Sequence, residues 1–300
     1  MAFRPSNVII NGVSYEPDNQ MPVSLFSPTF QYGLNVFEGI RGYIAPDQSP
    51  HLFLLEKHLN RLSRSAWLLQ MEFSSDSYAA LKSETNQLLD ECPPASDFYL
   101  KIMLGYLNEG SWSSTGPADR MLFWYPLASG RQLDHPRCVT AHLSSYQRIG
   151  NNSMPPQIKC GANYINSRLG TLSATAAGAD LPLFLNEQGY VSESSGACVF
   201  RVDGDRIETP PIHSSILPSI TRDFVLNTLG PNMTEYQFRE VELTRWDLYS
   251  ADEVFLVGTN AELLSIKNID QYTIGRVEKS TYPVTSHLAR EFFSRIFESK

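Results

Sequence analysis

The sequence predicts a mixed α/β (α+β) protein of two domains, and three observations lead to that class. The chain has 300 residues, of which 42% are hydrophobic and 19% charged, enough to bury more than one small core. Strand-like and helix-like segments follow one another along the whole chain. A polar, turn-rich stretch begins near residue 128. We expect a smaller first domain over residues 1–128, an interdomain loop region over 129–147 and a larger second domain over 148–300.

In the first domain we expect short strands and two helices. Apolar residues from Leu55 to Leu69 recur at helical spacing, which predicts a helix from residue 55. A second helix is expected over 78–90, opened by Ser75 or Asp76 as its cap. The expected strands, rich in aromatic and branched residues, are 22–26, 35–43, 51–54, 97–106 and 120–127.

In the second domain a helix is expected over 163–177, ahead of a series of antiparallel strands. The turn residues 186–189 and 203–205 separate apolar runs at 183–185, 190–192, 198–202 and 206–209, which predicts two hairpins. A short helix is expected after Thr221. Leu288, Phe292 and Ile296 share one face of a last helix.

Composition and charge exclude several classes of function. The net charge of −8 disfavours nucleic acid as a partner, because binding phosphates requires a basic surface. No apolar run approaches the roughly 20 residues of a membrane helix, and the first residues do not look like a secretory signal. The four cysteines and six histidines are scattered without metal-ligand spacing. We therefore expect a soluble cytoplasmic protein with no metal and no membrane partner.

Two residues are candidates for chemistry, and each has a plainer alternative. Lys159 lies between a proline-rich loop and a predicted helix start, where a desolvated amine could attack a carbonyl. Taken alone, however, a lysine in a soluble protein is usually a solvated surface charge. Glu193 ends a hydrophobic strand and meets the small residues 194–197. It is either a carboxylate held by a close-approach loop or a polar residue at a strand end.

Two turns are candidate anion sites. Residues 214–223 form a Ser/Thr-rich turn that opens a helix, where free amides and the helix dipole favour a phosphate. An ordinary helix cap is the alternative. Residues 257–262 follow a buried strand and either donate backbone amides to an anion or form a plain turn.

Together, a lysine amine, a carboxylate and two anion turns are what pyridoxal phosphate requires of a protein. Their order resembles the fold-type IV pyridoxal-phosphate enzymes, especially the branched-chain amino acid aminotransferases, over nearly the whole chain. The segments that carry the resemblance are YGLNVFEGIR at 32–41, HLNRL at 58–62, KCGANY at 159–164, LPSITRD at 217–223 and GTNAE at 258–262.

The resemblance implies a two-domain fold, with a smaller N-terminal α/β domain and a larger C-terminal pseudo-barrel domain. It implies an aminotransferase that uses pyridoxal 5′-phosphate. The amino group would move between an L-branched-chain or related hydrophobic amino acid and a 2-oxo acid such as 2-oxoglutarate. It also implies a homodimer or a dimer of dimers, with each active site bordered by the partner's first domain.

The same resemblance assigns roles to individual residues. Lys159 would be catalytic, as the Schiff-base lysine that shuttles a proton, and Glu193 would pair with the pyridine nitrogen. The residues implied to bind the cofactor are Arg61, Lys159, Tyr164, Glu193, Leu217, Ile220, Thr221 and Thr259. Those implied to bind substrate are Tyr32, Phe37, Arg41, Tyr99, Lys101, Thr259 and Asn260.

Three departures from the family pattern leave alternatives open. Lys101 stands where branched-chain enzymes have an arginine that receives a side-chain carboxylate, so charge is kept and the bidentate fork is lost. The segment 194–198 and Ser219 also differ from the family's residues. The alternatives are a transaminase with an unusual biosynthetic substrate, a D-amino acid or amine transaminase, an aminodeoxychorismate-type lyase, and a non-catalytic paralogue that binds the cofactor.

Overall fold

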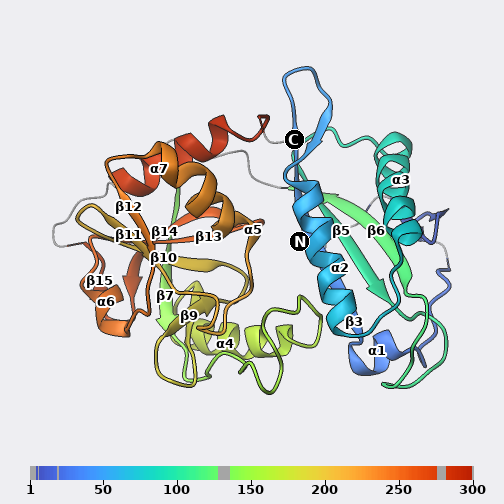
Figure 1. Cartoon of the computed structure of the whole chain (residues 1–300), viewed down its shortest axis with the longest axis horizontal. Helices are drawn as coiled ribbons and strands as arrows, with labels where there is room; N and C mark the ends of the chain where they lie inside the picture. Colours follow the sequence, from blue (N-terminus) through green and yellow to red (C-terminus); the bar gives the residue numbers. More distant parts are fainter. Residues whose placement is uncertain (1–4, 6, 19, 128–135, 276–281, 299–300) are drawn as a thin grey trace. The chain divides into compact units, whose positions relative to one another are not determined.

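The computed structural model describes the chain except residues 1–4, 6, 19, 128–135, 276–281 and 299–300. The chain divides into two compact units (Figure 1). Unit 1 contains the described residues before 128 together with Ile158–Ala162, and unit 2 contains those of 136–157 and 163–298. The boundary predicted at residue 128 lies outside the described residues. The segment Ile158–Ala162 groups with unit 1, although it lies within the range predicted for the second domain.

Unit 1 is built on a six-stranded sheet in which every neighbouring pair is antiparallel. The strand order is β2-β1-β6-β5-β3-β4. The strands are β1 (Val8–Ile10), β2 (Val13–Tyr15), β3 (Asn35–Ile44), β4 (Pro50–Leu52), β5 (Phe98–Gly105) and β6 (Asp119–Pro126). Along β5, Phe98, Leu100 and Ile102 are fully buried, whereas Tyr99 and Lys101 are half-buried. Because side chains alternate along a strand, Tyr99 and Lys101 lie on the face of the sheet opposite the core.

The core of unit 1 lies between this sheet and two helices, α2 (Leu55–Leu68) and α3 (Ser75–Glu91), seen beside β3, β5 and β6 in Figure 1. Leu59 and Leu62 of α2, and Leu81 and Leu88 of α3, are fully buried in one cluster with the inward residues of β5. The apolar spacing predicted α2 correctly. The cap of α3 is Ser74, one residue before the predicted candidates. A short helix, α1 (Pro28–Tyr32), precedes β3.

Two features at the start of unit 1 differ from the sequence prediction. Strands β1 and β2 form a hairpin around Asn11 and Gly12, whose φ angles of 49° and 83° are those a two-residue Asn-Gly turn requires. The prediction missed this hairpin although the Asn-Gly signal was present. The strand predicted at 22–26 was wrong. Leu25 and Phe26 are 66% and 65% exposed and belong to a turn before α1, so no packing face stabilises a strand there.

Unit 2 is built on a nine-stranded sheet. Its strands are β7 (Arg137–Leu143), β8 (Leu181–Leu185), β9 (Val191–Ser194), β10 (Cys198–Asp203), β11 (Arg206–Thr209), β12 (Gln237–Glu240), β13 (Glu253–Gly258), β14 (Glu262–Ile269) and β15 (Tyr272–Thr273). Strand β9 pairs with β8 and also with β10. The path β10-β13-β14-β7-β8-β9 therefore closes on itself, which confirms the expected pseudo-barrel.

Strand β7 occupies residues for which the sequence predicted an interdomain loop. It pairs in parallel with β14 and β8, and Val139 and Ala141 are buried in the unit 2 core. The polar residues around 128–136 hid this short strand, because only two inward residues mark it.

The α-helices of unit 2 are α4 (Tyr164–Ala176), α5 (Ile220–Phe224), α6 (Arg245–Tyr249) and α7 (Pro283–Ser294). A π-helix (Val225–Leu229) and a 3₁₀-helix (Gly230–Asn232) follow α5. Helix α4 lies close to β8 because Gly170 has no side chain: a Cβ there would stand 2.2 Å from the ring of Phe184. No helix of the described part of the chain is both long and apolar enough to cross a membrane.

We predict that Gly170→Ala destabilises the protein although alanine favours helices. The intrinsic gain is about 1 kcal/mol. The fully buried Phe184 ring cannot move aside easily, and overpacking of this kind costs about 1–3 kcal/mol. Urea unfolding should show a lower midpoint for Gly170→Ala. Thr175→Ala, at an exposed position of α4, is the control and should raise the midpoint slightly. A midpoint for Gly170→Ala at or above that of the wild type would contradict this packing.

Candidate active site

The backbone of Lys159 is fixed against the beginning of β3. The amide of Phe37 donates to the carbonyl of Lys159 at 3.0 Å, and the amide of Lys159 donates to the hydroxyl of Ser65 at 3.3 Å. Val36 and Cys160 form a β-bridge beside these contacts. Gly161 completes the attachment, because a Cβ there would lie 2.8 Å from the side-chain oxygen of Asn35. A segment that is distant in sequence is thereby joined to the unit 1 sheet.

The amines of two lysines lie near one aromatic ring. The Nζ of Lys101 is 3.3 Å from the centroid of the Phe37 ring, and the Nζ of Lys159 is 4.9 Å from the same centroid. Burial and, to a smaller extent, the positive charge of Lys159 lower the pKa of Lys101 to about 7, although the Glu38 carboxylate opposes the shift. The sequence placed both lysines in the site but did not show that they are neighbours.

Tyr99 and Arg41 lie beside this pair on neighbouring strands. Arg41 of β3 faces Tyr99 of β5, and Gly39 faces Lys101. A Cβ on Gly39 would lie 1.7 Å from the Tyr99 hydroxyl, so the tyrosine side chain lies across the glycine. Arg41 is buried, and its guanidinium carbon is 5.7 Å from the Tyr43 ring centroid. Four predicted substrate residues, Phe37, Arg41, Tyr99 and Lys101, therefore share one region of the unit 1 sheet.

Arg61 has a partner that the sequence prediction did not name. Its Nε and Nη2 donate to the two carboxylate oxygens of Glu38, at 2.7 and 2.8 Å. His58 Nδ1 lies 2.7 Å from the same carboxylate, and Glu38 is fully buried. Burial alone would raise the pKa of Glu38, but Arg61 and His58 outweigh it and lower the pKa to about 2. The carboxylate thus fixes the orientation of the arginine implied to hold phosphate.

Glu193 is held in unit 2 by hydrogen bonds from Arg148 and from a backbone amide. The Nε of Arg148 donates to Oε1 at 2.9 Å, and the backbone amide of Leu217 donates to Oε2 at 3.1 Å. Glu193 is only 4% exposed and lies opposite Cys198 across the β9–β10 pair. The Cys198 thiol also lies 4.0 Å from Oε2, as a weak third donor. A carboxylate has about four lone-pair positions, so these three hydrogen bonds leave capacity for one more donor. Sequence reasoning missed Arg148, which lies in a loop without a motif.

The two predicted anion turns are both formed in unit 2. The Ser219 hydroxyl accepts a hydrogen bond from the backbone amide of Arg222 and so caps α5. The backbone amides of Ile220 and Thr221 lie in the first turn of α5, where they have no hydrogen-bond acceptor within the helix. Both residues are buried. Thr259 and Asn260 follow the fully buried β13 directly. Gly258 lies so close to the backbone of residues 196–197 that a Cβ on it would be 2.9 Å from the Gly196 carbonyl oxygen.

The remaining predicted residues lie at helix ends. Tyr164 is the first residue of α4 and is half-buried. Tyr32 ends α1, is exposed, and packs edge-on against Trp112 with ring centroids 5.5 Å apart. The predicted site residues are divided between the two units. Unit 1 contains Lys159, Arg61 and the predicted substrate residues of the sheet. Unit 2 contains Tyr164, Glu193, Leu217 and both predicted anion turns.

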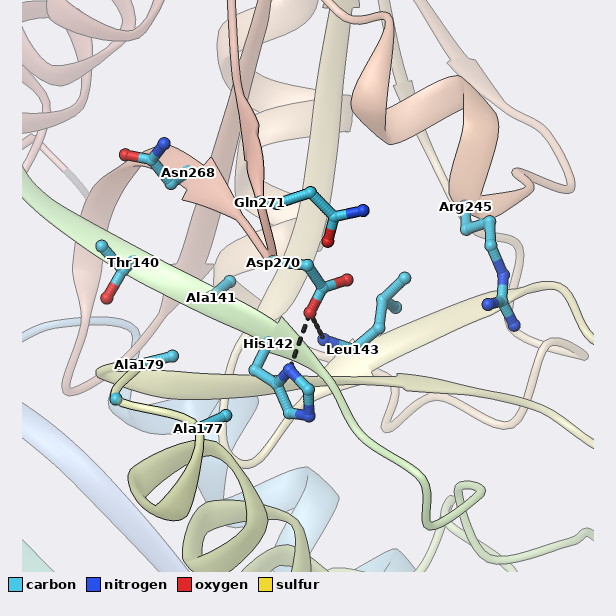
Figure 2. A pocket seen from close by; sticks show the side chains of 11 residues that line it. Thr140, Ala141, His142, Leu143, Ala177, Ala179, Arg245, Asn268, Asp270 and Gln271 are labelled. Atoms are coloured by element: carbon cyan, nitrogen blue, oxygen red, sulfur yellow. Dashed lines mark hydrogen bonds and ion pairs between the residues drawn. The ribbon is translucent and has the colours of Figure 1, made fainter.

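Figure 2 shows a surface cavity of unit 2 that involves none of the predicted site residues. His142 and Arg245 are among its lining residues, and Asp270 accepts from the backbone amide of Leu143 at 3.1 Å. His142 Nδ1 lies 2.7 Å from Asp270, and the Tyr249 hydroxyl donates to that carboxylate at 2.8 Å. These bonds tie the turn after β14 to β7, which is a structural role. Within the described residues no group of His, Cys, Asp or Glu could hold a metal ion.

Comparison with known proteins defines the class of this chain. The family model described as amino-transferase class IV matches residues 35–269, which is most of the chain. The protein belongs to the class IV aminotransferases. The matched range includes Lys159, Glu193 and both anion turns.

Its relatives include branched-chain aminotransferases. The probable branched-chain-amino-acid aminotransferase of Aquifex aeolicus is 31% identical over 283 residues, covering 93% of this chain and 89% of that protein. The branched-chain-amino-acid aminotransferase of Escherichia coli K12 is 30% identical over 283 residues, covering 90% of this chain and 87% of that protein.

Solved structures give the same result. The branched-chain aminotransferase from Thermoproteus uzoniensis, solved with norvaline, has a TM-score of 0.88 and 28% identity, and covers 99% of this chain and 96% of that one. The branched-chain amino acid aminotransferase from Thermobaculum terrenum, solved in its PLP-bound holo-form, has a TM-score of 0.86 and 30% identity. The match covers 99% of this chain and 95% of that one. The fold predicted from the sequence is thereby confirmed.

We predict that Glu38→Gln destabilises unit 1 by about 3 kcal/mol or more near neutral pH, because it removes the fully buried carboxylate that pairs with Arg61, whose side chain is only 10% exposed. Folding lowers the Glu38 pKa, so the ion pair stabilises the fold fully above about pH 4.5 and less as the pH falls towards 2. Urea unfolding from about pH 7 to pH 3 should show the difference between the two proteins shrinking below pH 4.5.

The control is Glu56→Gln, which removes an exposed partner of Lys82 and should cost less than about 1 kcal/mol. Equal stability losses in the two variants would contradict the importance of the buried pair.

Proposed function

We propose that this protein is a pyridoxal-phosphate-dependent aminotransferase. It would move an amino group between an L-branched-chain or related hydrophobic amino acid and a 2-oxo acid such as 2-oxoglutarate. The observation that carries the proposal is the position of Lys159. Both its backbone amide and its backbone carbonyl are hydrogen-bonded. Its side-chain amine lies near Phe37, in the region of the sheet that contains the predicted substrate residues. The names of the similar proteins support the substrate class.

The residues present fit the cofactor. The cofactor requires a primary amine, a buried carboxylate that can accept one more hydrogen bond, and a turn with unused backbone amides. Pyridoxal phosphate would supply an aldehyde that joins amines and a protonated ring that withdraws electrons from the substrate's α-carbon. Lys159, Glu193 and the α5 turn would meet these requirements.

The chain's own groups would then bind and move protons. The Lys159 amine would make the covalent attachment and afterwards carry a proton to and from the substrate's α-carbon. Glu193 would keep a proton on the ring nitrogen, while Arg148 holds the glutamate in place. Phosphate would be held by Arg61, by the amides of Ile220 and Thr221, and by Thr259. Tyr164 would donate to the phenolic oxygen and Leu217 would pack on the ring.

For the substrate, the sheet region of unit 1 offers a largely aromatic surface. Phe37 and Tyr99 would contact an apolar side chain, and Arg41, Lys101 and Tyr32 would lie around it. The amides of Thr259 and Asn260 would bind the α-carboxylate. A hydrophobic amino acid suits such a surface, because its burial removes apolar area from water.

We also propose that the protein is a homodimer of the cytoplasm. Leu25, Phe26, Phe30 and Trp112 of unit 1 are each about two-thirds exposed or more, and a partner subunit would cover such side chains. The four cysteines form no disulfide in the described structure, which suits a reducing compartment.

The first test is Lys159→Ala. The variant should fold, because its side chain is only half-buried, but should lose covalent attachment of the cofactor and all transamination. Mass spectrometry after borohydride reduction should find the cofactor on Lys159 in the wild type and on no residue of the variant. Circular dichroism checks folding, and a panel of amino donors with 2-oxoglutarate checks activity. Labelling of another lysine in the variant would place the chemistry elsewhere.

The second test is Glu193→Gln. An amide does not hold a proton on the ring nitrogen as a carboxylate does, so turnover should fall by about 100-fold or more while the cofactor remains bound. Glu208→Gln is a matched control, because Glu208 is another buried carboxylate paired with an arginine, Arg201, in unit 2. It should lose stability but keep turnover. Equal turnover in Glu193→Gln and Glu208→Gln would remove Glu193 from the reaction.

A further inference from the structure

The cavity of unit 2 in Figure 2 is not used by the proposed reaction. Its volume is about 570 Å³, within the range of pockets that hold small molecules. None of the predicted site residues is among its lining residues. We propose that this cavity binds a free α-amino acid, as a second site distinct from the one that contains Lys159. The inference goes beyond the proposed function and does not depend on it.

The ring of His142 presents a hydrogen-bond acceptor to the cavity. Its Nδ1 lies 2.7 Å from the carboxylate of Asp270. A carboxylate only accepts hydrogen bonds, so Nδ1 carries the proton, and in the neutral ring Nε2 keeps its lone pair. Figure 2 shows Nε2 on the side of the ring that faces away from Asp270. In the described residues Nε2 has no hydrogen-bond partner, and the side chain is 29% exposed. A ligand that donates a hydrogen bond would fill this position.

Asp270 holds the His142 ring in this orientation before any ligand binds. Its Oδ1 accepts from the backbone amide of Leu143 at 3.1 Å as well as from the imidazole. Its Oδ2 accepts from the hydroxyl of Tyr249 at 2.8 Å. The acceptor on His142 is therefore fixed in place, and a ligand loses little affinity to ordering it.

Arg245 supplies a positive charge at the same cavity. It is the first residue of α6, it is exposed, and it lines the cavity. Across the part of the chain that the structure describes, its guanidinium has no carboxylate partner. Burial and Asp270 raise the pKa of Tyr249, and Arg245 is near enough to oppose them. A guanidinium without a counter-charge is a forked donor that fits a carboxylate.

The end of α4 favours a cation at another part of the cavity. Ala177 and Gly178, which directly follow the last residue of α4, line the cavity. The C-terminus of a helix has carbonyls without partners in the helix, and its dipole favours positive charge. In Figure 2, Ala177 and Ala179 lie on one side of His142, and Arg245 lies on the other. The cavity therefore offers acceptors on one side and a cation on the other.

A free amino acid matches these groups both in charge and in hydrogen bonding. Its ammonium group would donate to His142 Nε2 near the end of α4, and its carboxylate would accept from Arg245. A simple anion would lack the donor and would meet the negative charge of Asp270. A metal ion would find one imidazole, and no group of His, Cys, Asp or Glu in the described residues could hold it. An apolar molecule would remove these polar groups from water without bonding to them.

The experiment observes His142 directly in the holoenzyme. NMR of protein with isotopically labelled histidine rings gives one signal for each of the six histidines, and His142→Gln identifies the signal of His142. Glycine is the probe. Acetate has the carboxylate alone, and betaine has both charges but no N–H donor. A ligand as small as glycine is expected to bind with a Kd of about 1 mM or weaker, so the titrations extend to about 100 mM at fixed pH.

Glycine should shift the His142 signal saturably. Acetate and betaine should each bind about tenfold more weakly or not at all, because each lacks the charge-assisted hydrogen bond from an ammonium group.

Three variants test the carboxylate partner. Arg245→Ala should weaken glycine binding about tenfold or more, whereas Arg245→Lys keeps the charge and should recover most of the affinity. Arg239→Ala is the matched control, because it removes another exposed arginine of unit 2 that does not line the cavity. It should bind glycine as the wild type does. Both arginines are exposed, so each variant should fold, and circular dichroism checks this.

The outcomes separate this inference from the proposed function. The absence of a saturable shift with glycine, or equal shifts with glycine and acetate, would overturn the amino acid site. Unchanged glycine binding in Arg245→Ala would overturn it as well, because the signal would then report binding elsewhere. Transamination of leucine by the wild-type preparation tests the proposed function separately, and its failure would leave the binding result unaffected.

Discussion

The attachment of residues 158–162 to the start of β3 is the contact on which the chemistry proposed for unit 1 depends. The bond from the Phe37 amide to the Lys159 carbonyl, together with the bond from the Lys159 amide to Ser65, anchors the lysine to the sheet and to α2. Without that attachment Lys159 would be a loop lysine, with many orientations and no fixed neighbour. With it, the amine lies beside Phe37, in the region where the strands present Tyr99 and Lys101.

Charge is distributed unevenly between the two halves of the proposed chemistry. Around Phe37, unit 1 gathers the amines of Lys101 and Lys159, while the buried carboxylate of Glu38 is used by Arg61 and His58. Such an excess of cations suits ligands that bring phosphate and carboxylate groups. In unit 2 the buried Glu193 is balanced by Arg148 instead, and in the proposed function this carboxylate is the acceptor for a protonated ring.

The sequence predicted features that depend on neighbouring residues better than features that depend on contacts between distant residues. Local spacing was enough for α2 and for the alternating strand β5, and ordered motifs were enough for the family. The partnership of Glu38 with Arg61 joins positions 23 residues apart, and the approach of Lys101 to Lys159 requires the tertiary pairing of their segments, so neither has a periodic signal. Short elements were the weak point: β7 has only two buried residues to mark it.

The closure of the unit 2 sheet has a consequence for how this enzyme can change. Strand β9, which carries Glu193, has ladder partners on both sides, and a one-residue shift of its pairing would turn the carboxylate to the other face. Insertions and deletions in β9 or in its turns are therefore poorly tolerated. The unit 1 face has no such restriction, since Lys101 can be exchanged without altering any strand pairing. Within the proposed function, substrate preference can therefore change through the side chains of β5 without disturbing the strand that carries Glu193.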